Sequence, residues 1–168
     1  TRTELEELAN ICHENKIMIV SDEIHSDLVF NGHKHIPIAS ISDEVAQNCM
    51  VCMAPSKTFN VAGLASSMVI IPNKCTFARY EKAIGIGHLG MGNIFGSVAL
   101  QASFSNGDEW LNQMLDYVWK NYLFLEDFFK TNLPKIKVMK PEATFLVWLD
   151  FTAYEMNDKE LWKFTTEK

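Results

Sequence analysis

The chain has 168 residues, 48% of them hydrophobic, with 15 basic against 21 acidic side chains and a formal net charge of −6. This composition is typical of one globular domain of roughly 150 residues and excludes an intrinsically disordered chain. The acidic balance argues against a nucleic-acid or membrane partner, and no apolar run is long enough to cross a bilayer. The four cysteines predict reduced thiols in a cytoplasmic protein.

Helix signals lie at both ends of the chain. Thr3 and Glu6 have the spacing of an N-terminal capping box, which predicts a helix almost from the first residue. Asn157 and Glu160 predict another helix, which reaches Lys168 without a glycine or proline stop signal. We therefore expect the chain to be a piece of a longer protein.

Three apolar runs predict strands. Residues 17–20 are apolar on both faces, as in a strand buried within a mainly parallel sheet, and a short helix at 43–47 separates them from a second strand at 49–53. A third strand is predicted at 67–71. The link between the second and third strands is about as short as a parallel crossover allows and has no helical pattern. We therefore expect these two strands to pair antiparallel.

Helical patterns dominate the second half. Residues 75–84 and 93–105 predict two helices around a glycine-rich stretch at 85–92. A longer helix begins at Asp108 and ends before Pro134. It carries one narrow apolar stripe and would be about 35 Å long, enough to connect two lobes. Two apolar segments, 136–138 and 144–149, then predict a hairpin that opens a second, α+β lobe.

Polar residues follow two of the predicted strands. Asp22 and His25 follow the first, and Ser56 and Lys57 follow the second. Ligands of open α/β sheets bind beyond the carboxyl ends of the strands. A carboxylate and an amine there are what pyridoxal 5'-phosphate (PLP) requires, because the amine bonds to the cofactor and the acid keeps the pyridine nitrogen protonated. The same residues also fit ordinary turns, caps and surface charges, so spacing alone leaves both interpretations open.

Other reactive side chains favour structural interpretations. Cys49 and Cys52 have redox-motif spacing, but positions three apart in a strand point to opposite faces, so two packed thiols are expected. His33 and His35 fit a polar turn better than a metal site, and no metal is predicted. Two acidic residues near His25, Glu23 and Asp27, either orient that histidine or cap the next turn.

Five separated segments carry a resemblance to a known family: 20–28, 32–37, 54–64, 92–96 and 143–150. In order and spacing they resemble the class I/II aminotransferase superfamily of fold type I, above all its MalY/PatB-type cystathionine β-lyases. The resemblance implies an α/β fold with a mostly parallel sheet and helices. Residues 1–106 would be a portion of the PLP-binding large domain, 107–134 a connecting helix, and 135–168 the start of a truncated small domain.

The resemblance also implies roles for individual residues. Lys57 matches the lysine that binds PLP covalently and later moves the substrate Cα proton. Asp22 matches the acid that pairs with the pyridine nitrogen, and His25 stands where many relatives place a tyrosine facing the 3-hydroxyl group. Ser56 is a candidate phosphate contact. The stretch at 90–93 falls in a region that reaches the neighbouring subunit in such dimers.

Some of the family's pattern is not found. Ala54 and Ala65 occupy positions where many aminotransferases have a phosphate-binding serine and arginine. The remaining candidates for phosphate binding are Ser56, Ser66 and Ser67. The family is more than twice as long as this chain, and its phosphate loop, ring-stacking aromatic and carboxylate-binding arginine have no counterpart here. We therefore expect this chain to be inactive on its own.

The function that the resemblance implies is that of a PLP-dependent C–S β-lyase. Such an enzyme cleaves sulfur amino acids to pyruvate, ammonia and a thiol, and relatives usually form homodimers. An aminotransferase is the alternative, because the same residues serve both reactions. A non-catalytic regulatory relative is the second alternative.

Overall fold

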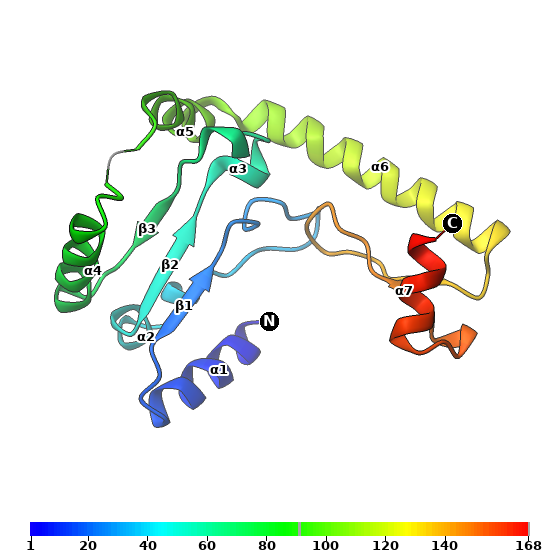
Figure 1. Cartoon of the computed structure of the whole chain (residues 1–168), viewed down its shortest axis with the longest axis horizontal. Helices are drawn as coiled ribbons and strands as arrows, with labels where there is room; N and C mark the ends of the chain where they lie inside the picture. The colour runs from blue at the N-terminus through cyan, green and yellow to red at the C-terminus, as the bar shows by residue number, and fades with distance from the viewer. Residues whose placement is uncertain (91, 168) are drawn as a thin grey trace.

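The computed structural model describes residues 1–90 and 92–167 (Figure 1). Met91, in the glycine-rich stretch, and Lys168, in the final predicted helix, lie outside the described residues. The described elements, in chain order, are α1 (Arg2–Glu14), β1 (Ile19–Asp22), η1 (Ile38–Ser40), α2 (Asp43–Gln47), β2 (Cys49–Met53), α3 (Pro55–Thr58), η2 (Ala62–Leu64), β3 (Met68–Ile70), α4 (Lys74–Ile86), α5 (Ile94–Asn106), α6 (Asp108–Asn132), β4 (Lys137–Val138), β5 (Leu149–Asp150), η3 (Thr152–Tyr154) and α7 (Asp158–Thr166).

A three-stranded mixed sheet organises the first half of the chain. The central strand, β2, pairs in parallel with β1 and antiparallel with β3, which confirms the predicted direction of β3. Ile38, Cys49 and Val51 form a small buried core on one face of the sheet. Helices α1 and α2 contribute Leu5 and Val45 to its edge. Apolar burial on this face thus fixes the register of the strands.

The first strand differs from its prediction in position and in burial. It begins at Ile19 rather than Ile17, because Lys16 takes a left-handed φ of 56° and the N–H of Ile17 donates to the carbonyl of Cys12. Residue 17 therefore completes the turn after α1. Burial on both faces is also wrong for this chain: Val20 is 61% exposed, because the core lies on the opposite face, where Ile19 packs.

The cap of α1 is the second correction. The predicted pair Thr3 and Glu6 is wrong, because the helix already includes Arg2. Thr1 and Glu4 form the capping box instead: the hydroxyl of Thr1 accepts from the N–H of Glu4, whose side chain bonds back to Thr1. Both pairs have the required spacing, so the sequence pattern alone did not distinguish them.

The link between β2 and β3 is the third correction, because it contains the short helices α3 and η2. One turn is too short to show a 3.6-residue pattern. Its signal is Pro55 at the first helical position, where a fixed φ and a missing N–H cost nothing. Further along, α5 packs closely on the turn after η2: a Cβ added at Gly96 would collide with the carbonyl of Leu64 and the hydroxyl of Ser66.

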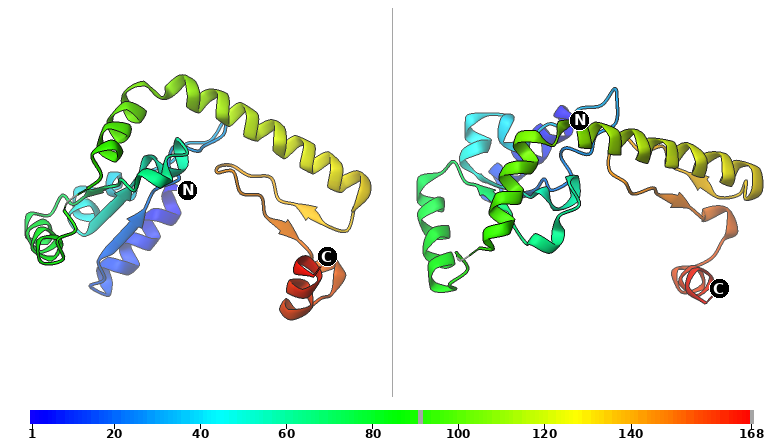
Figure 2. Two further views of the ribbon diagram at one scale, coloured as in Figure 1. Left: turned by 45° about the horizontal axis from the view of Figure 1, so that its top comes forward. Right: turned by 90° about the horizontal axis from the view of Figure 1, so that it is seen from above.

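Helix α6 connects the sheet to the far end of the molecule (Figures 1 and 2). It confirms the predicted long helix and its start at Asp108. The antiparallel hairpin is also confirmed, but the strand expected at 144–149 is wrong except for Leu149, because β5 covers only Leu149–Asp150. The predicted capping box of Asn157 and Glu160 is confirmed. No described helix is long and apolar enough to cross a membrane.

Candidate functional site

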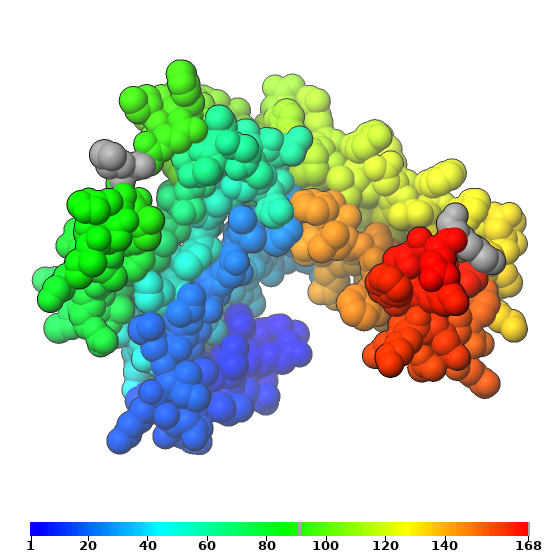
Figure 3. All heavy atoms as spheres, viewed as in Figure 1, coloured from blue at the N-terminus to red at the C-terminus, as the bar shows by residue number. Residues whose placement is uncertain are grey.

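A cavity of about 410 Å³ lies beyond the carboxyl end of β1. Figure 3 shows the surface around it, with the hairpin tip lying against the first half of the chain. Two predicted site residues, Asp22 and His25, line this cavity. The other lining residues are Thr1, Leu5, Glu23, Ser26, Val29, His33, Lys34, His35, Ile36, Glu142, Ala143 and Thr144.

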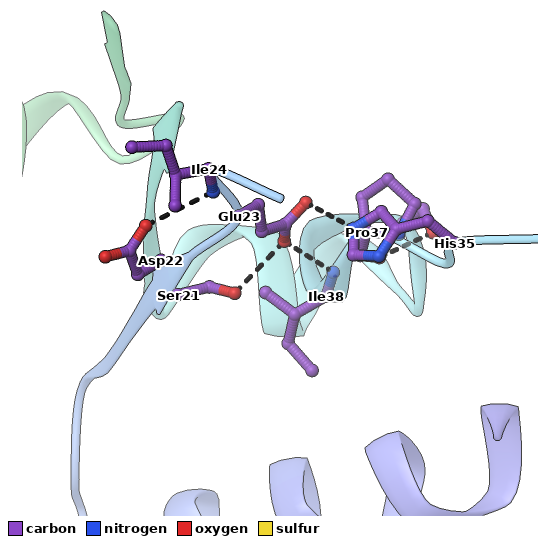
Figure 4. Close-up of polar contacts among 8 residues, drawn as sticks. Ser21, Asp22, Glu23, Ile24, His35, Pro37 and Ile38 are labelled. Carbon is purple, nitrogen blue, oxygen red and sulfur yellow. Dashed lines mark hydrogen bonds and ion pairs between the residues drawn. The ribbon is translucent and has the colours of Figure 1, made fainter. Parts of the chain in front are cut away.

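Asp22 is the last residue of β1, where it pairs with Cys52 of β2. Its side chain is exposed, and Oδ1 accepts a hydrogen bond from the N–H of Ile24 at 3.2 Å (Figure 4). This contact turns the chain immediately after the strand. The carboxylate is therefore held at the edge of the sheet while it remains accessible from the cavity.

Glu23 is buried and anchors the turn that follows Asp22 (Figure 4). Oε1 accepts from the hydroxyl of Ser21 and from the N–H of Ile38, both at 3.1 Å, and Oε2 lies 2.8 Å from Nε2 of His35. Because a carboxylate only accepts, the His35 tautomer with its proton on Nε2 satisfies both groups. Glu23 thus binds His35, and the expectation that it orients His25 or caps the next turn is wrong.

His25 lies in the turn that follows Asp22, and its ring contacts the hairpin formed by β4 and β5. Its ring centroid is 5.5 Å from that of Phe145. Nδ1 of His25 is buried and makes no hydrogen bond within the described part of the chain. A buried ring nitrogen without a partner costs free energy, so such an atom marks a candidate ligand contact.

The tip of the hairpin formed by β4 and β5 completes this side of the cavity, and sequence reasoning missed that role. The N–H of Thr144 donates to the carbonyl of Leu28 at 2.6 Å, and the N–H of Phe30 donates to that of Glu142 at 3.0 Å. Thr144 takes a left-handed φ of 69°, a conformation that costs a threonine free energy. The only sequence signal was the turn at Pro141, which did not reveal its partner.

The other two predicted site residues lie on α3, directly after the adjacent strand β2. Ser56 is half-buried and Lys57 is exposed. Because β1 and β2 are parallel neighbours, α3 and the turn after Asp22 begin at the same edge of the sheet. Among the described residues, neither Ser56 nor Lys57 lines the cavity that holds Asp22 and His25.

The remaining polar candidates have structural partners. Asp27 accepts a hydrogen bond from Thr58, so the expectation that it orients His25 or caps a turn is wrong for this residue too. Burial raises the pKa of the Cys49 thiol, with a smaller contribution from Glu23, so the thiol is protonated and unreactive at neutral pH. Among the described residues, no three His, Cys, Asp or Glu side chains are grouped to hold a metal ion.

Comparison with known proteins identifies the family of this chain. The family model for aminotransferase class I and II matches residues 1–168. The chain belongs to the class I and II aminotransferase family. This membership confirms the resemblance, and with it the α/β fold class of the PLP-dependent fold type I enzymes.

Within the class I and II aminotransferase family, the similar proteins include C–S lyases. The chain is 46% identical over 161 residues to cystathionine beta-lyase PatB of Bacillus subtilis, covering 96% of this chain and 42% of PatB. Cystalysin from Treponema denticola, whose crystal structure contains PLP, aligns over 100% of this chain and 43% of its own, with 33% identity and a TM-score of 0.91.

A PLP-bound C–S lyase from Staphylococcus hominis is also similar in structure to this chain. It has 34% identity and a TM-score of 0.84, and the alignment covers 94% of this chain and 40% of that structure. The chain therefore spans less than half the length of each of these relatives.

Proposed function

We propose that the protein containing this chain is a PLP-dependent C–S β-lyase that cleaves sulfur amino acids such as cystathionine to pyruvate, ammonia and a thiol. One observation carries the proposal. The carboxylate of Asp22 ends β1, and the amine of Lys57 follows the parallel neighbour β2, in a chain 46% identical to a cystathionine β-lyase. The edge formed by the carboxyl ends of parallel strands is where α/β proteins bind ligands.

The residues on this edge fit the cofactor. The exposed carboxylate of Asp22 is free to approach the pyridine nitrogen, and the unpartnered Nδ1 of His25 suits a ring substituent that can donate or accept a hydrogen bond. Lys57 would hold the cofactor covalently, and Ser56 would contact its phosphate. When bound, PLP supplies an electron sink for the substrate carbon from which a proton is removed.

Each proposed residue performs a distinct task in this reaction. Lys57 takes the proton from the substrate Cα, since its amine is the mobile base at the site. Asp22 keeps a proton on the pyridine nitrogen, which preserves the electron-withdrawing form of the ring. His25 and the hairpin tip at 142–144 shape the side of the cavity next to Asp22. Loss of a thiolate from the substrate Cβ then distinguishes elimination from transamination.

The proposed assembly follows the domain organisation expected from the sequence. Residues 1–106 would be part of the large domain, α6 the connecting helix, and 135–168 the start of the small domain. The protein would act as a homodimer, as the family resemblance implies. The four free cysteines support a cytoplasmic location.

Absorbance spectroscopy of the complete gene product with added PLP tests the cofactor assignment. We expect a visible band that Lys57→Ala abolishes, and a fall in kcat of about 10²- to 10⁴-fold because the base is lost. Lys74→Ala is a matched control, since Lys74 is also exposed and follows a strand of the same sheet. An unchanged band in Lys57→Ala would remove Lys57 from the mechanism.

Product analysis tests the reaction. With cystathionine, a lyase releases pyruvate and a thiol, whereas an aminotransferase forms a keto acid only in the presence of an amino-group acceptor. The absence of any turnover together with retained folding would favour the non-catalytic alternative.

A further inference from the structure

A partly buried hydrogen bond joins the two segments that carry the proposed site residues. Oγ1 of Thr58 donates to Oδ2 of Asp27 at 2.9 Å. Thr58 has no exposed surface, and Asp27 is half-buried. Thr58 directly follows Lys57, and Asp27 lies two residues after His25. The bond therefore connects residues 31 positions apart, one in the segment that carries Asp22 and His25 and the other in the segment that carries Lys57.

The segment that carries Asp27 is well anchored at both ends. Glu23 fixes its start through a buried hydrogen bond from the N–H of Ile38 and a partly buried contact with His35. The N–H of Ser26 donates to the carbonyl of Glu23, and Leu28, at the other end, is 1% exposed. These hydrogen bonds and the burial of Leu28 hold the segment in place, so Asp27 is a fixed acceptor for Thr58 of α3.

Helix α3, in contrast, has little helical stability of its own. It has four residues, and Ala54 at its N-cap offers no side-chain cap. An isolated turn of this length is unstable, because nucleation fixes several residues for very few hydrogen bonds. Pro55 and Thr58 are both buried, so the inner side of the turn is held by tertiary contacts while Lys57 projects from the outer side.

We propose that the hydrogen bond from Thr58 to Asp27 is a positioning contact that sets the Lys57 amine relative to Asp22 and His25. The inference rests on the proposed function. The bond fixes the backbone next to Lys57 against the segment that begins at Asp22. A misplacement of about 1 Å in such a group lowers a reaction rate about 10²-fold, so a single hydrogen bond beside Lys57 can affect turnover without touching the substrate.

Thr58→Val in the complete protein tests this role, because it removes the hydroxyl and keeps the shape of the side chain. We expect kcat to fall about 10- to 100-fold while KM changes less than about threefold, because positioning of the base is lost rather than substrate binding. The pH at which the visible band of the cofactor-loaded protein changes should also shift, since that pH reports the surroundings of Lys57. Thr58→Ser retains the hydroxyl and should restore both properties.

A matched control exists among the C-terminal residues 135–167. The hydroxyl of Thr152 donates to Oδ1 of Asp150 at 2.6 Å, and this threonine–aspartate bond is exposed and local. Thr152→Val should leave kcat and the pH of the spectral change at wild-type values. In a double-mutant cycle, Asp27→Ala combined with Thr58→Val should be no worse than the more damaging single variant, because both remove one bond.

The outcomes separate the two proposals. The absence of a Lys57-dependent band in the wild-type protein would refute the proposed cofactor site. A normal band together with unchanged kcat and an unchanged spectral pH profile in Thr58→Val would refute the positioning role alone, even if the variant melted at a lower temperature.

Should Thr58→Val fail to fold, Asp27→Asn carries the test. The side-chain oxygen of the introduced asparagine still accepts the bond from Thr58, but the bond is weaker because the acceptor is neutral, so kcat should fall by less than in Asp27→Ala. Equal kcat in these two variants would overturn the inference.

Discussion

The cavity region and the C-terminal residues 135–167 are held together in different ways. Around the cavity, polar side chains join residues far apart in the chain: Glu23 contacts residues 12 and 15 positions away, and Thr58 reaches back 31 positions to Asp27. Within the described residues 135–167 the side-chain hydrogen bonds span two to four residues and are exposed, as in the bond between Thr152 and Asp150 and the cap formed by Asn157.

This difference has a physical consequence. An exposed local bond competes with water and contributes little net stability, whereas a buried group that loses its partner pays the full cost of desolvation. Substitutions near the cavity should therefore be costly, and equivalent substitutions in residues 135–167 should be mild. In the complete protein, the first prediction below tests this contrast directly, and the next two compare it with close backbone packing and with a local bond in the connecting helix.

Glu23→Ala should have the largest effect on stability. It leaves the buried N–H of Ile38 and the ring of His35 without an acceptor, so the free energy of unfolding should fall by about 2 to 3 kcal/mol. Chemical denaturation monitored by fluorescence measures the change. Glu167→Ala is the control in residues 135–167: its contact with Lys163 is 3.7 Å long and exposed, and its loss should cost less than about 0.5 kcal/mol. Equal losses in the two variants would contradict the contrast.

Gly96→Ala tests the packing of α5 on the turn after η2. The new Cβ would overlap the backbone carbonyl of Leu64, which cannot move aside as a side chain can, so we expect a loss of about 2 kcal/mol. Gly85→Ala is the matched control, because Gly85 lies in α4 with no atom near its added Cβ. It should raise stability by about 0.5 kcal/mol, since alanine is the better helix former. Thermal unfolding of both variants distinguishes close packing from a general intolerance of glycine replacement.

Tyr122→Phe should have a smaller effect, although Tyr122 is buried on α6. Its hydroxyl donates to Oε1 of Glu126 at 2.6 Å, and removal of this local bond should cost about 1 kcal/mol near pH 7. Burial, with help from Glu126, raises the pKa of Tyr122 to about 12 from its usual 10. The folded state therefore binds this proton more tightly than the unfolded state does, so the contribution is complete below pH 10 and is lost as pH rises toward 12. Unfolding measured across this range should show a steeper alkaline decline in wild type than in Tyr122→Phe.

Local sequence signals predicted the elements that depend on neighbouring residues. The capping box at Asn157 and the start of α6 at Asp108 were correct, because caps and amphipathic stripes are set within a few residues. The antiparallel direction of β3 followed from the short link alone. The cap at Thr3 failed because an equivalent pair two residues earlier satisfied the same rule.

The sequence by itself determined which chemical groups are present at the sheet edge: Asp22 at the end of β1, His25 after it, and Ser56 and Lys57 after β2. Tertiary structure alone decided which side chains support them. No spacing rule pairs Glu23 with His35, Asp27 with Thr58, or the hairpin tip with Leu28. These contacts arise because a folded chain must satisfy its buried polar groups with whatever partners the packing of distant segments brings within reach.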